Sequence, residues 1–160
     1  MGDFAASNQG LFGSGAEHAI ALDLGDWMAD LFKTVNATVT NKTGILHLSI
    51  TAGLRQYVMC RADYRYALDG GKKSPWMPID HFNRHKGDIS REWPVSDCSK
   101  LAGAEICVQF VVARLETSES DFRLKAALSV GGSAISGAEI TFAEKLAANA
   151  ASRDAWFYLS

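Results

Sequence analysis

The sequence is poor in cysteine, in unbalanced charge and in long apolar runs, and each shortage excludes a class of protein. Its three cysteines, Cys60, Cys98 and Cys107, form no Cys-x-x-Cys pair, which argues against a disulfide framework and a zinc knuckle. Sixteen Lys and Arg against 18 Asp and Glu give a formal net charge of −2, without the basic surplus of a nucleic-acid-binding domain. No stretch approaches the ~18 apolar residues of a membrane-spanning helix. We therefore expect no nucleic-acid partner and no transmembrane segment.

The sequence motifs of common enzymes are missing as well. There is no Gly-x-Ser-x-Gly elbow, no phosphate-binding Gly-x-x-x-x-Gly-Lys-[Ser/Thr] loop and no Gly-x-Gly-x-x-Gly fingerprint. Cys98 follows Asp97, whose carboxylate raises the pKa of a neighbouring thiol and makes it a poorer nucleophile. Cys60 and Cys107 lie in strand-like runs, which is typical of small buried thiols. We predict a non-enzymatic protein with no catalytic residues and no cofactor.

The first residues predict an arm rather than a folded element. Residues 1–16 are rich in Gly, Ser, Ala and Asn, which is typical of a flexible terminus. Residues 17–160 are then expected to form a single β-sandwich domain. The start MGDFAASNQGLFGSG lacks the basic region and the apolar core of a secretory signal. We expect cytoplasmic synthesis without a signal peptide, followed by assembly into a virion or by release without a leader.

Two alternating runs give the strongest structural signal. They are EICVQFVVARLE at 105–116 and DFRLKAALSV at 121–130. In the second run, alternate residues from Phe122 to Leu128 are apolar and fall on one face, because side chains on a strand alternate sides with a period of two. The short polar link 117–120 between the runs predicts an antiparallel hairpin.

The rest of the pattern agrees with a mainly β fold. We predict an antiparallel β-sandwich or distorted barrel of about eight strands. A hairpin is expected around the turn Asn41-Lys42-Thr43-Gly44. Strands are expected over residues 17–23, 37–40, 45–50, 56–68, 138–142 and 154–159.

One of these strands, QYVMCRADYRYAL, carries a charged face. Arg61, Asp63 and Arg65 fall on one side, and Tyr64 and Tyr66 fall on the other. Opposite charges that follow each other along a wet face pair weakly or meet a partner.

Two helices are expected beside the strands. Over residues 24–35, apolar side chains recur at helical spacing and predict an amphipathic helix. Over residues 143–151, the alanine-rich composition predicts a short second helix.

Residues 74–99 are expected to form a long irregular loop that contains all three prolines. Long loops in compact domains are usually functional or held by their own packing. Flat aromatic rings combined with donors in this loop predict a ligand- or partner-binding site. The candidate residues are Trp76, His81, Arg84, His85, Arg91 and Trp93. The alternative is that the two tryptophans only hold the loop against the core.

The same loop offers a metal-site hypothesis. His81 and His85 are four residues apart, as in His-x-x-x-His zinc segments. No glutamate stands between them to act as a base, and no third ligand is evident, so we predict no metal site. An enzyme or metal centre around residues 80–85 remains the third hypothesis for function.

The leading hypothesis is a non-enzymatic structural protein, a self-associating β-sandwich subunit of a larger assembly such as a phage or virion tail, decoration or fibre. Sheet edges must be covered, and another copy of the chain is one way to cover them. The second hypothesis is a carbohydrate- or lipid-binding sandwich that binds a glycan or a lipid headgroup. A helix followed by an Asn-Lys-Thr-Gly hairpin is similar to the arrangement in small pore-forming sandwich toxins, which implies a membrane-active form of this second hypothesis.

Overall fold

The computed structural model of the protein describes residues 31–160, except 42, 54–56, 86–88, 114–120 and 147–148. The predicted arm over residues 1–16 and the predicted strand over 17–23 lie outside the described residues.

The described chain is built of strands. Two short 3-10 turns join them, η1 (Asp69–Gly71) and η2 (Cys98–Lys100). The strands are β1 (Phe32–Ala37), β2 (Ile45–Gly53), β3 (Tyr57–Arg65), β4 (Met77–His85), β5 (Ile89–Asp97), β6 (Glu105–Ala113), β7 (Asp121–Val130), β8 (Ser133–Lys145) and β9 (Ala150–Leu159). No helix in this part of the chain is long and apolar enough to cross a membrane.

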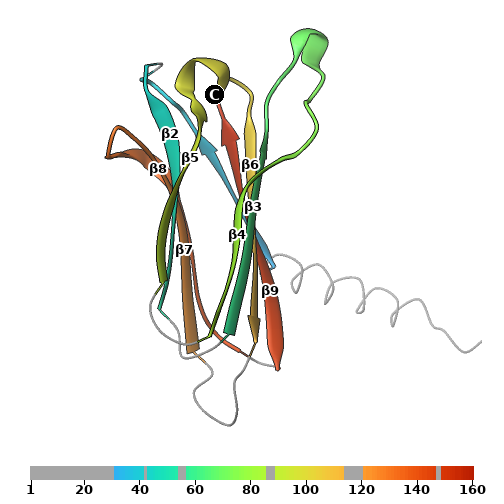
Figure 1. Ribbon diagram of the computed structural model, residues 1–160, viewed down its shortest axis with the longest axis vertical. Coiled ribbons are helices and arrows are strands. Elements are labelled where there is room, and N and C mark those ends of the chain that lie inside the picture. Colours follow the sequence, from blue (N-terminus) through green and yellow to red (C-terminus); the bar gives the residue numbers. More distant parts are fainter. Residues whose placement is uncertain (1–30, 42, 54–56, 86–88, 114–120, 147–148) are drawn as a thin grey trace, which may run out of the picture. The chain divides into compact units, whose positions relative to one another are not determined.

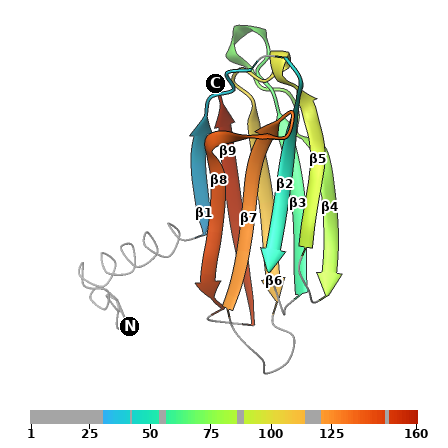
Figure 2. The same ribbon diagram turned by 90° about the vertical axis from the view of Figure 1, so that its left-hand side faces the viewer.

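The strands form two sheets that face each other (Figures 1 and 2). One sheet has five strands in the order β1-β9-β6-β3-β4, and the other has four in the order β5-β2-β7-β8. Strand β1 runs parallel to β9, and the other paired strands are antiparallel. The mainly β prediction is therefore confirmed, with nine strands in the described residues.

The core fills the space between the sheets. Alternate residues of the central strands are buried, as the period-two pattern predicts. Phe110 of β6 and Phe142 of β8 are both fully buried and meet edge to face, with ring centroids 6.5 Å apart. Because β6 and β8 belong to different sheets, this aromatic pair joins the two layers.

Different side-chain contacts join the edge strands of the two sheets on the two sides of the sandwich. On one side, Lys33 of β1 donates from Nζ to the carbonyl oxygen of Thr141 of β8 at 2.8 Å and lies over the Phe142 ring. On the other side, Trp93 of β5 stacks on Phe82 of β4, with centroids 6.0 Å apart. Side chains rather than backbone hydrogen bonds therefore close this sandwich at β4 and β5.

The predicted helices are not confirmed. Residues 32–35 of the predicted helix 24–35 belong to β1, and residues 24–30 lie outside the described residues. The predicted helix 143–151 is replaced by the end of β8 and the start of β9. Helix propensity is a weak preference, and short isolated helices are marginal. Pairing with β7, β6 and β9 supplies the backbone hydrogen bonds instead.

The predicted hairpins are wrong. The predicted strand 37–40 is wrong as well, because β1 ends at Ala37 and residues 38–40 belong to no strand, whereas the strands predicted at 45–50, 105–116 and 121–130 overlap β2, β6 and β7. Strands β6 and β7 lie in different sheets, so they do not form a hairpin. Strands β1 and β2 are not paired either. A true hairpin joins β7 to β8, where Gly131 and Gly132 both have positive φ and Val130 pairs with Ser133. Such a two-residue turn needs positive φ at both central residues.

The predicted irregular loop 74–99 is also wrong in its greater part. It contains β4 and β5, the edge strands of the two sheets on one side. Pro78 and Pro94 each stand beside a register shift, at Ala62/Asp63 in the β3–β4 pair and at Leu46/His47 in the β2–β5 pair. Proline within sheets is confined to edge strands and bulges. The two prolines therefore indicate the edge strands β4 and β5 and not a loop.

Candidate functional site

The strongest candidate for a functional site is the outer face of the five-stranded sheet, opposite to the core. Alternate residues of its strands fall on this face and line two shallow hollows. We call the following set the outer face: Phe32 and Thr34 of β1, Arg61, Asp63 and Arg65 of β3, Glu105, Cys107 and Gln109 of β6, Asp154, Trp156 and Tyr158 of β9, and Trp76, which precedes β4.

The sheet register arranges these residues in rows across the strands. Cys107 lies between Asp63 and Trp156 in one row. In the adjacent row, Gln109 lies between Arg61 and Asp154. Directly opposite residues in antiparallel strands have Cβ atoms about 5 Å apart, so each row is a set of contacting side chains.

Three aromatic rings form a continuous group on this face. Trp76 meets Trp156 edge to face, with ring centroids 5.7 Å apart and planes at 74°. Trp156 and Tyr158 are two residues apart on β9, and their rings are nearly parallel with centroids 6.5 Å apart. Trp76 and Tyr158 are exposed, at 37% and 39% of their full areas. Aromatic area of this kind is available to a ligand.

Trp76 is held in place by a chain of charges. The Arg65 guanidinium lies 4.5 Å from the centre of the Trp76 ring, a favourable cation–π distance. The same guanidinium donates from Nε to Glu105 Oε2 at 2.7 Å. Lys73 Nζ lies 3.1 Å from the other oxygen, Oε1, of Glu105. Glu105 therefore holds the cation on which Trp76 packs.

A second ion pair lies beside the tryptophans. Arg61 donates from Nε to Asp63 Oδ2 at 2.7 Å and from its terminal nitrogen to Oδ1 at 3.2 Å. The two parallel bonds fix the orientation of the guanidinium plane. The hydrogen bonds from Arg61 to Asp63 raise the pKa of the guanidinium, so it stays charged.

The pKa values of two carboxyl groups of the outer face, Glu105 and Asp154, are shifted in opposite directions. Burial raises the pKa of Glu105, but hydrogen bonds from Arg65 and Lys73, together with their charges, outweigh it and leave the pKa below its ordinary value. Burial raises the pKa of Asp154, and a hydrogen bond from Gln109 opposes this only in part. Glu105 is thus a fixed anion, while Asp154 is the outer-face carboxyl group that takes up a proton more readily.

The thiol of Cys107 is a poor nucleophile, although it lies between Asp63 and Trp156 on the outer face. Burial, followed by the negative charges of Asp154 and Asp63, raises the pKa of its thiol to about 12. The thiolate is the nucleophilic form, and at neutral pH its population at this position is negligible. We assign Cys107 no catalytic role.

Two shallow hollows flank Trp156. One, of about 230 Å³, is lined by Arg61, Asp63, Trp76 and Gln109 as well as Cys107 and Trp156. The other, of about 320 Å³, is lined by Phe32, Thr34, Asp154, Trp156 and Tyr158. Trp156 is the wall that the two hollows share. This arrangement provides two adjacent subsites, each with an aromatic wall and at least one carboxyl group.

The structure separates the residues that the sequence predicted as one site. Trp76 belongs to the outer face. His81 is exposed and pairs with Arg61 across the β3–β4 ladder, beside that face. Trp93 packs against the core. Arg91 is exposed on β5 in the other sheet. Arg84 and His85 lie in β4, and their side chains are outside the described part of the structure.

Sequence reasoning missed the contributions of β6 and β9. Trp156 and Tyr158 lie on one side of β9, as the period of two along a strand requires, but nothing in the sequence pattern indicated that this side faces outward next to β6. The shared face of Arg61, Asp63 and Arg65 was the usable signal, and it is confirmed. Among the described residues, no group of three or more His, Cys, Asp or Glu could hold a metal ion.

Comparisons with known proteins name no function. No family model matches the chain, and no curated protein matches it. Among solved structures, the chain is similar to a domain of unknown function, DUF4425, from Bacteroides vulgatus, at 8% identity and a TM-score of 0.40. The similarity covers 72% of this chain and 96% of that one.

Proposed function

We propose that the protein is a non-enzymatic carbohydrate-binding β-sandwich that binds a glycan chain on the outer face of its five-stranded sheet. The observation that carries the proposal is the pair of hollows on either side of Trp156, each with an aromatic wall and hydrogen-bonding groups. Aromatic faces cover the apolar C–H face of a sugar ring, and a few fixed polar groups orient its hydroxyls. Two neighbouring sugar units occupy one hollow each, with Trp156 between them.

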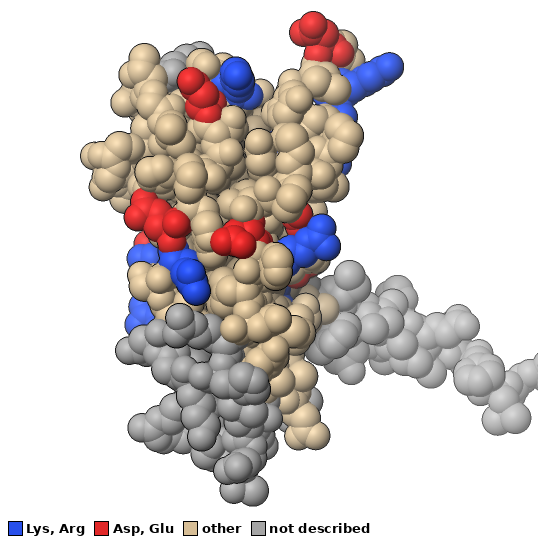
Figure 3. All heavy atoms as spheres, viewed as in Figure 1, with Lys and Arg blue, Asp and Glu red and all other residues tan. Residues whose placement is uncertain are grey.

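The charges of the face favour a neutral glycan. The basic groups Arg61, Arg65 and Lys73 are each already paired with Asp63 or Glu105. A cation that is engaged by a protein carboxylate offers little net attraction to an acidic sugar. On the surface that Figure 3 presents, acidic and basic side chains likewise stand in small mixed groups rather than in a patch of one sign. We therefore favour uncharged hexose chains over acidic ones.

A glycan array tests this proposal. Wild-type protein is expected to bind neutral hexose oligosaccharides of two or more units. Trp156→Ala is expected to weaken binding at least ten-fold, about 1.4 kcal/mol, because it removes the wall that both hollows share. Calorimetric titration with the best array ligand measures the change.

Trp93→Phe is the matched control for this experiment, since it replaces a tryptophan that stacks on Phe82 in the core and lines neither hollow. Its glycan affinity is expected to equal that of the wild type. The proposal fails if no neutral glycan binds, or if Trp156→Ala, shown to be folded by its circular dichroism spectrum, binds as tightly as the wild type.

Self-association is the second candidate function, and one observation favours it. Six large apolar side chains are exposed in the described part of the chain, and four of them lie on the strands of this one face or next to it: Phe32, Met59, Trp76 and Tyr158. An exposed apolar patch of this kind is typical of an interaction surface. A second copy packing face to face would bury the four side chains, as in a subunit of a larger assembly.

Sedimentation over a range of protein concentrations tests self-association. The prediction is a dimer or larger species at high concentration that Met59→Lys converts to monomer, because a charge buried in an apolar contact is costly. Ile45→Lys is the control, since Ile45 is exposed on β2 of the other sheet. A monomer at every concentration would reject this candidate and leave the glycan proposal standing.

A further inference from the structure

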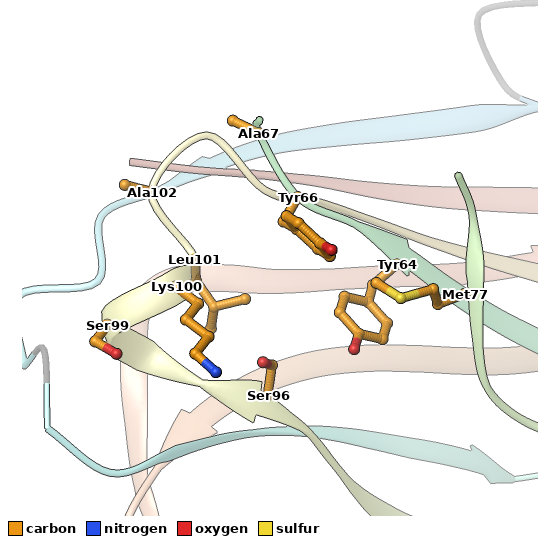
Figure 4. A pocket seen from close by; sticks show the side chains of 9 residues that line it. All are labelled: Tyr64, Tyr66, Ala67, Met77, Ser96, Ser99, Lys100, Leu101 and Ala102. Carbon is orange, nitrogen blue, oxygen red and sulfur yellow. The ribbon is translucent and has the colours of Figure 1, made fainter. Parts of the chain in front are cut away.

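A separate hollow lies on the side of β3 that faces away from the outer face, between the two sheets. Its volume is about 620 Å³, within the range of small-molecule sites. Tyr64 of β3, Tyr66 just after β3 and Met77 at the start of β4 line it from the side of the five-stranded sheet. Ser96 of β5 and the segment after it line it from the other side (Figure 4).

The hollow exists because both edge strands are bulged there. Strand β4 carries an extra residue, Ile79, opposite the Ala62/Asp63 step of β3, and β5 carries an extra residue, Val95, opposite the Leu46/His47 step of β2. A bulge bends its strand and increases its twist. The two bulges lie on the two edge strands, which no backbone ladder joins, and Ser96 and Met77 beside them line the hollow.

The polar groups of this hollow converge and have no partner in the described residues. The hydroxyls of Tyr64 and Tyr66, Ser96 Oγ and Lys100 Nζ point into the same space in Figure 4. None of the four makes a hydrogen bond or ion pair with another described residue. Tyr64, Tyr66 and Ser96 are half-buried and Lys100 is exposed. Polar groups without a protein partner are normally satisfied by water or by a ligand.

Lys100 is the charged group of the lining. Hydrogen bonds from Ser99 and, to a smaller extent, the charge of Lys100 lower the pKa of the neighbouring Asp97 carboxylate. The Asp97 carboxylate accepts hydrogen bonds from the Ser99 backbone N–H at 2.8 Å and from the Ser99 hydroxyl at 2.7 Å. Asp97 makes no ion pair with Lys100. The ammonium group therefore gives the hollow a positive pole, with hydroxyl donors beside it.

The remaining wall is apolar. Leu101 is almost completely buried and presents its side chain to the hollow beside Lys100. Met77 and the two tyrosine rings stand across from it (Figure 4). Met adapts to ligands of irregular shape. The lining thus combines a cationic pole, neutral hydroxyls and an apolar body.

We propose that this hollow binds a small monocarboxylate with an apolar body. The carboxylate pairs with Lys100 and accepts hydrogen bonds from Ser96 and the tyrosine hydroxyls, which are groups that a carboxylate satisfies as an acceptor. The apolar body lies against Leu101 and Met77. The site is independent of the glycan proposal, because Tyr64 of β3 and Tyr66 just after it line this hollow, whereas Arg61, Asp63 and Arg65 of β3 lie on the outer face.

Three probes separate the parts of this proposal: octanoate, 1-octanol, which has the body without the charge, and acetate, which has the charge without the body. Titrations are followed by two-dimensional NMR of labelled protein. Octanoate is expected to bind at least ten-fold more tightly than either of the other two and to shift resonances of Ser96 and Leu101. Equal affinity for octanol, or for acetate, would overturn the proposal.

Lys100→Met tests the charge while it keeps an unbranched side chain that is only one atom shorter. It is expected to weaken octanoate binding at least ten-fold and to leave octanol binding unchanged. Lys72→Met, at an exposed lysine that does not line the hollow, is the control and is expected to bind octanoate as the wild type does. Trp156→Ala is also expected to bind octanoate normally, so failure of the glycan proposal is distinguishable. Unchanged octanoate affinity in Lys100→Met would overturn the assignment.

Discussion

Phe110→Ala is expected to lower the free energy of unfolding by about 3–5 kcal/mol, the largest effect of any single truncation considered for this protein. Phe110 is fully buried on β6, and its ring meets the Phe142 ring of β8 edge to face. The substitution removes apolar contact with both sheets at once and leaves a cavity that strands on either side cannot fill without moving. Denaturant unfolding followed by fluorescence measures the loss.

Phe32→Ala is the matched control for Phe110→Ala. Phe32 is exposed at 44% of its area on edge strand β1, so its truncation is expected to change the free energy of unfolding by no more than about 0.5 kcal/mol. Comparable losses in the two variants would contradict the view that the Phe110–Phe142 pair, rather than the number of phenylalanines, joins the layers.

Alternation along single strands was readable from the sequence because it is a local property. Residues of β7 alternate between buried and exposed positions as the pattern of Phe122 and its successors requires. The division of β3 into a charged side and a tyrosine side was also predicted correctly. Side-chain period depends only on backbone geometry, so it survives without knowledge of the partner strands.

The pairing of strands was not readable, because neighbours in the sequence are not neighbours in these sheets. A short link between β6 and β7 indicated a hairpin, yet each strand pairs within a different layer. The composition of a loop indicates that the chain turns, but it does not indicate whether the next strand belongs to the same sheet. The parallel pairing of β1 with β9, at opposite ends of the described chain, has no local signal at all.

The candidate site was predicted only in part, because its residues come together through long-range strand pairing. Trp76 and Trp93 were grouped because they lie in one stretch of sequence, but Trp76 faces outward beside Trp156, whereas Trp93 stacks on Phe82 in the interior. The true neighbours of Trp76 come from β3 and β9. Only the register of the five-stranded sheet brings these rings and charges together, and that register is set by long-range pairing.

Glu105→Gln is expected to destabilise the fold at neutral pH by about 1–3 kcal/mol, because it removes the charge that Arg65 and Lys73 share. Glu105 is exposed at only 8% of its area, so water cannot replace the lost interaction fully. Arg65 also supports Trp76, and the variant is therefore expected to change tryptophan fluorescence of the folded protein and to weaken glycan binding. Denaturant unfolding at several pH values measures the stability change.

The pH dependence gives the sharper test of Glu105. Its pKa in the folded state lies below the ordinary value of 4.5, so the folded state favours the ionised form. The stabilisation is therefore complete above about pH 4.5 and is lost as the pH falls through the folded-state pKa. The stability difference between wild type and Glu105→Gln should shrink over that acidic range.

Glu139→Gln removes a half-exposed glutamate that pairs with Lys125, and should cost much less at neutral pH because solvent screens that pair. A difference for Glu105→Gln that stays constant down to the acid limit would show that shape, and not charge, accounts for the role of Glu105 beside Arg65.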